Sequence, residues 1–332
     1  MNELRKAINA VSEHALVLAE HDRKVFRITG VDALDLLHRI STNDLLNRPA
    51  DQSITTVFCN EKGRVIESAE ILCRGGDLTG RDLRGPDLTG SDLTGSELFM
   101  TCSAAGSEAL LRWIDKFTIT EDIHLIDVSD VFSTHCLIGP QAIQRVTTIL
   151  LLAGHFWHGR FGSLPCLRIL SPKETPPESL GALIGIPVVE SGRTYEFLRV
   201  LHSVPLFGHE IVDAFNPYEV GLIDAISFTK GCYIGQEVIA RLDTYKKVQR
   251  QLRMLWSDSS GMPQPGTPVV VAGEHAGILT SSTSGLGRVI VLAVLRSDAI
   301  QGHEVFRIND FPYVVNEVSP PPYSLIFQRD AE

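Results

Sequence analysis

The C-terminal part of the chain consists of short apolar runs separated by glycines, and no other feature of the sequence restricts the fold as strongly. Six runs rich in β-branched and aliphatic side chains span residues 252–256, 267–272, 276–281, 289–295, 303–308 and 313–318. The glycines that punctuate them are Gly261, Gly273, Gly285, Gly287 and Gly302. Short strands at about ten-residue spacing, with turn residues between them, are typical of a closed antiparallel sheet. We therefore predict a small C-terminal antiparallel β-barrel domain over residues 246–332.

The preceding residues, 1–245, combine helical and strand patterns. Apolar residues recur at helical spacing over residues 3–20. Two apolar runs, 57–59 and 65–72, flank a turn that contains Gly63, which predicts a β-hairpin. Helices and strands within one region predict the α+β class.

The composition is typical of a globular protein, with a hydrophobic content of 44% and a charged content of 21%. The sequence contains no run of about 18 apolar residues, so we expect no membrane span. The first residues are charged and do not form a signal-peptide pattern, so we expect a cytoplasmic protein. A net charge of −10 argues against direct nucleic-acid binding.

The cysteines do not form a metal-binding or disulfide pattern within the chain. They lie at positions 59, 73, 102, 136, 166 and 232, and no two are spaced as Cys-x-x-Cys. This spacing argues against a zinc ribbon, a ferredoxin-type cluster and a disulfide framework. Any metal held by Cys232 would need ligands from elsewhere in the fold or from a second protein.

The stretch from Ser227 to Arg241 is where we expect the chemistry. Alternating apolar residues predict a short half-buried strand up to Lys230, and the breaker-free run after Gly235 predicts a helix. Cys232 lies in the loop between them, where the Lys230 cation and the helix dipole would favour its thiolate. The alternative is a buried structural cysteine in a turn.

The octapeptide Lys230 to Glu237, Lys-Gly-Cys-Tyr-Ile-Gly-Gln-Glu, resembles the hallmark motif of the YgfZ family. These folate-binding proteins are related to the T protein, the aminomethyltransferase of the glycine cleavage system. The resemblance covers most of the chain and is weakest at about 75–100 and 140–190. Its other matching segments are Phe26–Ala33, Ser41–Asp44, Asn60–Val65, Leu198–Val200, Val204–Gly208 and Asn216–Leu222.

The resemblance implies a T-protein-like folate-binding fold, in which mixed α/β domains surround a central cavity. Residues 1–245 would form two subdomains with an insertion at 76–100, and the barrel would follow them. It also implies a tetrahydrofolate-binding accessory protein that acts in iron-sulfur cluster assembly or repair, and in processes such as tRNA modification. Cys232 would be the functional thiol and a candidate ligand of a transient iron-sulfur cluster shared with an assembly or client protein. The other residues implied at the functional site are Lys230, Gln236 and Glu237.

The folate contacts are expected among five residues. The resemblance implies that an arginine in the segment Leu198–Val200 binds the carboxylate end of the cofactor, and Arg199 is the candidate; a guanidinium suits this role because it binds a carboxylate through two hydrogen bonds. The alternative is a surface ion pair with Glu196. From Lys230 to Arg253 the sequence has six basic and two acidic residues, which suits an anionic ligand and equally suits a solvated helix face. The full set of candidate folate contacts is Arg199, Glu196, Glu67, Tyr233 and Arg241.

Glu67 bears on whether the chain is an enzyme. Aminomethyltransferases carry paired aspartates where this sequence has Glu67 and Ser68. The longer glutamate side chain would displace the carboxylate by more than catalytic geometry tolerates. This departure argues against a folate-dependent aminomethyltransferase, which remains the alternative function. Glu67 could instead be a plain solvent-facing strand residue.

Residues 76–100 form five tandem five-residue units that resemble a pentapeptide repeat. The leucines at 78, 83, 88, 93 and 98 recur with a period of five. Five units make little more than one coil, too few for a stable stack. We predict an insertion at a hairpin tip without a catalytic role; a scaffold that acts through this insertion is the alternative.

Overall fold

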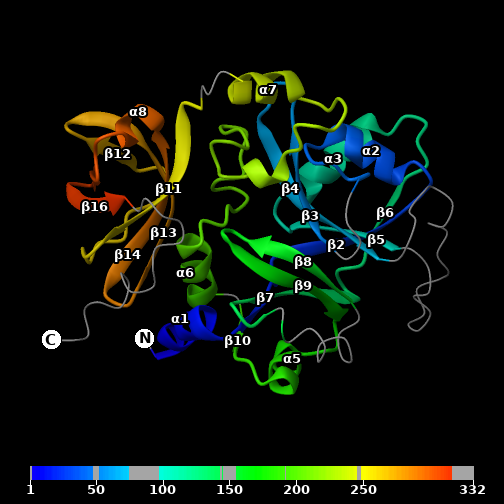
Figure 1. Ribbon diagram of the computed structural model, residues 1–332, viewed down its shortest axis with the longest axis horizontal. Coiled ribbons are helices and arrows are strands. Elements are labelled where there is room, and N and C mark those ends of the chain that lie inside the picture. Colours follow the sequence, from blue (N-terminus) through cyan, green and yellow to red (C-terminus); the bar gives the residue numbers. More distant parts are fainter. Residues whose placement is uncertain are drawn as a thin grey trace.

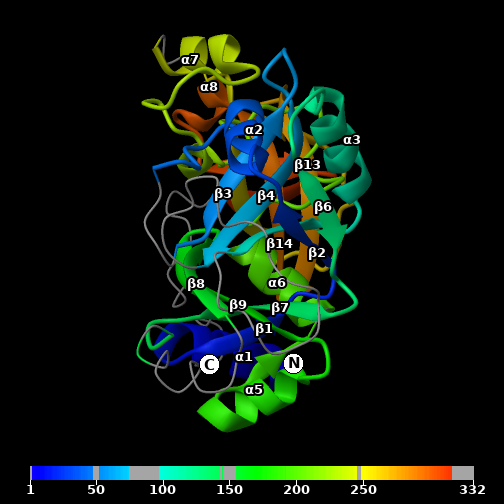
Figure 2. The ribbon, with the colours of Figure 1, turned by 90° about the vertical axis from the view of Figure 1, so that its right-hand side faces the viewer.

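The computed structural model of the chain describes residues 2–47, 52–74, 97–142, 144, 155–190, 192–244 and 248–315. Within these ranges the strands form two five-stranded sheets and one closed barrel. Figure 1 shows the barrel on one side of the molecule and the two sheets on the other. In Figure 2 the first sheet and its helices lie above the second sheet. This arrangement agrees with the predicted α+β class and with the predicted C-terminal barrel.

The first sheet has the strand order β3-β4-β5-β2-β6. One of its faces packs against helices α2 and α3, and this core contains Phe26, Leu37, Met100 and Trp113. The predicted hairpin with Gly63 in its turn is confirmed as β3–β4. The elements are β2 (Arg23–Thr29), α2 (Ala33–Ile40), β3 (Ile54–Cys59), β4 (Val65–Arg74), β5 (Glu97–Ser103), α3 (Ser107–Phe117) and β6 (His124–Asp127).

The second sheet has the strand order β10-β1-β7-β9-β8. Strand β1 belongs to this second sheet, whereas the next strand, β2, belongs to the first sheet. The chain therefore crosses from the second sheet to the first near its N-terminus. The elements are α1 (Asn2–Glu13), β1 (Leu16–Ala19), β7 (Phe132–Ile138), β8 (His155–Phe161), β9 (Leu164–Pro172), α5 (Pro177–Ile184), β10 (Val188–Val189) and α6 (Arg193–Leu201).

The C-terminal strands close into an antiparallel barrel in the order β11-β14-β13-β12-β15-β16, which confirms the predicted barrel. Its interior is filled by apolar side chains such as Leu255, Val291 and Phe306. The elements are β11 (Arg250–Ser257), β12 (Pro268–Val271), β13 (Glu274–Gly285), β14 (Arg288–Arg296), α8 (Ser297–Ile300), β15 (Val305–Ile308) and β16 (Phe311–Val315).

The predicted strand before Lys230 is wrong. A short 3-10 helix, η2 (Ile223–Ala225), is followed by irregular chain with a bend over residues 228–230. Helix α7 (Gln236–Thr244) begins after Gly235 as expected. Ile226 is buried, but Phe228 remains 49% exposed. The alternation of apolar residues therefore did not mark one buried face of a strand.

The repeat region joins two neighbouring strands. β4 and β5 pair up to Arg74 and Glu97, so the chain between them connects adjacent strand ends, as a hairpin insertion would. The fifth repeat unit is not part of a separate coil, because Leu98 to Met100 are buried residues of β5. The other units, before Ser96, lie outside the described residues.

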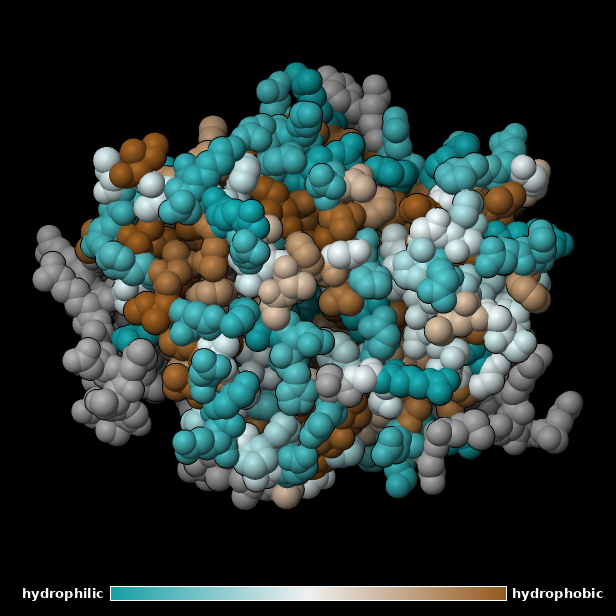
Figure 3. Space-filling view, turned by 180° about the vertical axis from the view of Figure 1, so that it is seen from behind, coloured by the Kyte–Doolittle hydropathy of each residue, from teal (hydrophilic) through white to brown (hydrophobic). Residues whose placement is uncertain are grey.

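The rear surface in Figure 3 mixes hydrophilic and hydrophobic residues, with hydrophilic side chains dividing the apolar patches. None of the described helices is long and apolar enough to cross a membrane.

Candidate functional site

The octapeptide loop lies against the turn of the β3–β4 hairpin. Gly235 has a φ of 82°, and a Cβ placed on it would lie 2.7 Å from the carbonyl oxygen of Asn60. Gly63, in the hairpin turn, has a φ of 66° and packs under Val238 of α7. Only glycine combines a left-handed backbone with so close an approach. Two glycines distant in sequence thus bring the octapeptide onto the first sheet.

Cys232 is exposed, whereas Cys59, Cys73, Cys102, Cys136 and Cys166 are buried. The interpretation of Cys232 as a buried structural cysteine is therefore wrong. Burial raises the pKa of the Cys59 and Cys102 thiols, the latter to about 12, so these sulfurs stay protonated. Cys232 is the one cysteine of the six that a partner or reagent can reach.

Lys230 does not serve as a free cation beside the thiol, which corrects the sequence-based prediction. Its Nζ donates to the carbonyl oxygens of His38, Ser41 (2.7 Å) and Asn43 (2.8 Å). An ammonium group has three protons, so all its donors are used. Burial lowers the pKa of Lys230 to about 8. The residue fastens the octapeptide loop to the end of α2.

The remaining octapeptide residues have separate environments. Tyr233 is buried, and its ring centroid lies 5.2 Å from the Lys230 Nζ. Gln236 is the first residue of α7. Glu237 and Arg241 form the expected ion pair at 2.5 Å, and both side chains are largely exposed. Such a surface pair contributes little to stability.

Glu67 is not a solvent-facing strand residue, since only 1% of it is exposed. Ser103 Oγ donates to its Oε2 at 2.5 Å, and the Ser68 amide donates to its Oε1 at 2.9 Å. A Cβ at Gly106 would lie 1.6 Å from Glu67 Oε2, so this glycine leaves the room that the carboxyl occupies. Burial raises the pKa of Glu67 to about 7. A carboxyl group with such a pKa can exchange protons near neutral pH.

A buried ionic network, which we did not predict from the sequence, joins the two sheets. Arg168 on β9 pairs with Glu20, which follows β1, at 2.6 Å, and with Glu70 on β4 at 2.5 Å. All three side chains are less than one-tenth exposed. Charged residues within otherwise apolar strands were the available signal, because buried charges are rare unless paired.

Arg23 extends this network toward Glu67. Its Nη2 donates to the hydroxyl and the carbonyl oxygen of Thr101 at 2.7 and 3.2 Å. The positive charge of Arg23 partly offsets the rise in the pKa of Glu67 that burial causes. The Nε atoms of Arg23 and Arg168 are buried and have no hydrogen-bond partner among the described residues. Buried polar groups are normally hydrogen-bonded, so this region suits a polar ligand.

Arg199 is a structural residue in this conformation. It is buried, and its N–H groups donate to the Glu196 carboxylate, Val204 O, the Glu210 carboxylate and Ser281 Oγ. These bonds use all five of its donors. A folate carboxylate could bind Arg199 only by displacing one of these partners. The geometry thus favours the alternative ion pair with Glu196, but in the interior rather than on the surface.

Among the described residues, no group of three or more His, Cys, Asp and Glu side chains is arranged to hold a metal ion.

Comparisons with known proteins agree with the fold. No protein-family model matches the chain. A putative chloroplastic transferase of Arabidopsis thaliana is 25% identical over 319 residues, which cover 88% of this chain and 68% of the relative. An aminomethyltransferase of Moorella thermoacetica is 26% identical over 304 residues, which cover 84% and 78% of the two chains.

The crystal structure of the glycine cleavage system aminomethyltransferase T from Bartonella henselae superposes with a TM-score of 0.71. It is 14% identical and covers 96% of this chain and 88% of its own. The expected T-protein-like fold is confirmed, whereas membership of the YgfZ family stays a prediction. The chain is thus a sequence relative of aminomethyltransferases with the fold of glycine cleavage system aminomethyltransferase T.

Proposed function

We propose that this protein binds tetrahydrofolate and acts in the cytoplasm in the assembly or repair of iron-sulfur clusters, with Cys232 as its functional thiol. The exposure of Cys232 carries the proposal, because the other five cysteines are buried. The loop that presents it is fixed on one side by Lys230 and on the other by Gly235. A thiol held in this way can ligate an iron atom that an assembly or client protein also ligates.

The interior near Glu67 is the proposed position of the folate. A pterin ring carries several hydrogen-bond donors and acceptors, and the unpartnered Nε atoms of Arg23 and Arg168 supply donors for it. Glu67 would accept a hydrogen bond as a carboxylate or donate one as an acid. The folate, when bound, would supply a carrier for one-carbon units.

Titration of the purified chain with tetrahydrofolate tests the folate part of the proposal. We expect saturable binding at one site per chain. Replacement of Arg23 with methionine should weaken binding about tenfold, since it removes a charged donor. Arg307→Met, at an exposed position of the barrel, is the matched control and should bind like the wild type. Absence of saturable binding would refute the proposal.

A folate-dependent aminomethyltransferase is the second candidate function, and the burial of Glu67 favours it. Its pKa of about 7 places the carboxyl between its two protonation states at physiological pH. In this role Glu67 would hold or move a proton at the nitrogen of the transferred group. The relatives that are named as aminomethyltransferases support this candidate.

Replacement of Glu67 with glutamine should change how stability depends on pH. The pKa of Glu67 is raised from 4.5 to about 7 on folding, so the folded state holds this proton more tightly. The contribution of Glu67 to stability is then greatest below pH 4.5 and decreases as the pH rises to about 7, by about 3 kcal/mol. Urea unfolding of wild type and Glu67→Gln at several pH values measures this difference.

Two further observations decide the role of Glu67. Glu304→Gln, at an exposed residue before β15, should keep the wild-type slope. Parallel curves for wild type and Glu67→Gln would contradict the raised pKa. If the chain is a transferase, it converts tetrahydrofolate and an aminomethyl donor to methylene-tetrahydrofolate, ammonia and the free donor group, and Glu67→Gln abolishes this turnover. No turnover by the wild-type protein would exclude the second candidate.

A further inference from the structure

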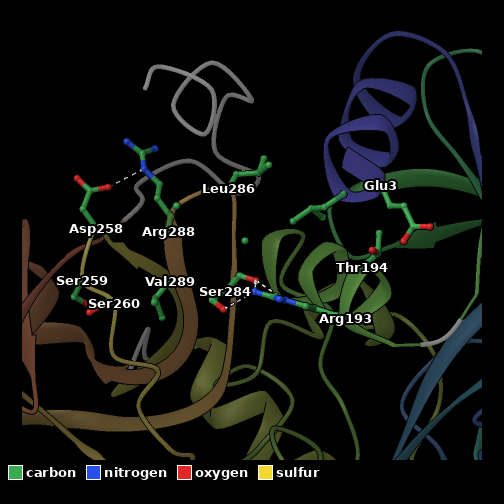
Figure 4. A pocket seen from close by; sticks show the side chains of 13 residues that line it. Glu3, Arg193, Thr194, Asp258, Ser259, Ser260, Ser284, Leu286, Arg288 and Val289 are labelled. Atoms are coloured by element: carbon green, nitrogen blue, oxygen red, sulfur yellow. Dashed lines mark hydrogen bonds and ion pairs between the residues drawn. The ribbon is translucent and has the colours of Figure 1, made fainter. Parts of the chain in front are cut away.

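A cavity of about 480 Å³ lies where the barrel meets α1 and α6 (Figure 4). Among the described residues, none of those predicted for the thiol or folate site lines it. Its volume is in the range of small-molecule sites. The lining residues are Glu3, Leu4, Arg193, Thr194, Asp258, Ser259, Ser260, Ser284, Gly285, Leu286, Gly287, Arg288 and Val289.

The barrel packs closely against α1 and α6 at one edge of the cavity. A Cβ on Gly285 would lie 2.2 Å from Leu4 Cδ2 and 2.9 Å from the ring of Phe197, so the β13–β14 hairpin contacts both helices directly. Leu286 and Gly287 in its turn have φ angles of 52° and 76°. This left-handed turn fixes one rim of the cavity.

Arg193 crosses the cavity toward Ser284 (Figure 4). Its Nε and Nη2 donate to the Ser284 carbonyl oxygen at 3.0 and 2.9 Å, and Nη2 also donates to the hydroxyl at 3.0 Å. Both acceptors are neutral, and no carboxylate among the described residues pairs with Arg193. The N-cap of α6 is Gly192, which has no side chain to bond the amides of the first helical turn. The cavity therefore offers an uncompensated positive charge.

The two acidic residues in the cavity wall, Asp258 and Glu3, differ in their ion pairing. Asp258 on the barrel side accepts a hydrogen bond from Arg288 Nε at 3.1 Å, and the Arg288 guanidinium lies 4.2 Å from the centroid of the Trp256 ring. Glu3, on the opposite wall in Figure 4, has no ion pair with any described residue. Arg193 and Glu3 thus line the same cavity, and neither forms an ion pair with a residue that the structure describes.

We propose that this cavity binds a small zwitterion, a free α-amino acid or a short peptide. The carboxylate would bind Arg193 and the first-turn amides of α6, since a guanidinium binds a carboxylate by charge-assisted hydrogen bonds. The ammonium group would pair with Glu3. Leu4, Leu286 and Val289 supply apolar surface for the side chain. This site does not depend on the proposed folate or thiol functions.

Calorimetric titration of the full chain tests the proposal with L-alanine, trialanine, N-acetyl-trialanine and trialanine amide. We expect saturation at about 1 mM or below with an unblocked probe, and at least tenfold weaker binding when either charged end is blocked. Saturation by alanine identifies a free amino acid as the ligand class, whereas saturation by trialanine alone identifies a peptide. No saturation by about 10 mM, or equal binding of blocked and unblocked probes, would overturn the proposal.

Two variants locate the binding. Glu3→Gln removes a charge from an exposed residue and should weaken binding at least tenfold without changing the melting temperature. Arg193→Met should also weaken binding at least tenfold, through loss of the carboxylate contact, and Arg307→Met is the control away from the cavity. Unchanged binding by Glu3→Gln and Arg193→Met would show that the probes bind elsewhere and would refute the assignment.

Discussion

Replacement of Cys232 with serine is expected to abolish the rescue of iron-sulfur enzymes in a strain that lacks this protein. A serine hydroxyl stays protonated at neutral pH and cannot replace a thiolate as an iron ligand. Because Cys232 is exposed, the substitution removes no core contact and should change stability by less than about 0.5 kcal/mol. The activity of an iron-sulfur enzyme in complemented cells measures the rescue.

The same variant separates the thiol from the folate site. Tetrahydrofolate affinity and melting temperature of Cys232→Ser should equal those of the wild type, because Glu67 and Arg23 lie in the interior of the two sheets. Thr229→Ala, at an exposed residue of the same bend, is the matched control and should rescue fully. Full rescue by Cys232→Ser would remove the cysteine from the mechanism, even if folate binds.

Thiol labelling of the folded protein checks the structural premise of this prediction. A charged thiol reagent should modify one cysteine per chain, and Cys232→Ser should not be modified. The remaining five cysteines should react only after unfolding, because they are buried. Fast modification of a second cysteine in the native state would show that exposure does not single out Cys232.

The parts of the fold that local patterns encode could be predicted from the sequence. The barrel strands follow from short apolar runs between turn residues, and α7 follows from an unbroken run after Gly235. The hairpin turn at Gly63 follows from the glycine between two apolar runs. These features need little information about residues distant in the chain.

The role of Lys230 could not be predicted locally, because its acceptors lie 187 to 192 residues earlier in the chain. Sequence proximity suggested Cys232 as its neighbour. The preferred acceptors were instead the carbonyl groups at the end of α2, which would otherwise lack a strong donor. The thiol is therefore presented by a loop that the lysine holds, rather than activated by a free ammonium group.

The environment of Glu67 was also beyond local reasoning. In an isolated hairpin one face of β4 would meet solvent, but here β4 lies between β3 and β5, and the second sheet covers the face that carries Glu70. Glu70 is buried as a result, whereas Glu67 lies three residues earlier and therefore on the opposite face. There Ser103 and Gly106 enclose its carboxyl group. This enclosure by residues more than 30 positions along the chain, which no periodicity records, gives a strand glutamate a pKa of about 7.

Replacement of Arg199 with methionine is expected to cause the largest loss of stability of any variant considered. Arg199 is 1% exposed, and the variant leaves the fully buried Glu210 without its cation. Removal of one partner of a buried ion pair costs about 3–5 kcal/mol, because the remaining charge is desolvated and unpaired. Arg199 also joins α6 to Ser281 of β13, so the loss should loosen the barrel from the helices.

Chemical unfolding of three variants assigns this loss to its cause. Glu196→Gln, whose side chain is 33% exposed in the same network, should cost less than Arg199→Met because solvent compensates the change. The double variant Arg199→Met with Glu210→Gln should recover part of the loss, since it removes the unpaired charge. If Arg199→Met costs less than about 1 kcal/mol, the buried pair with Glu210 is not the source of stability. The guanidinium would then be free enough to bind a ligand carboxylate, as the family resemblance implies.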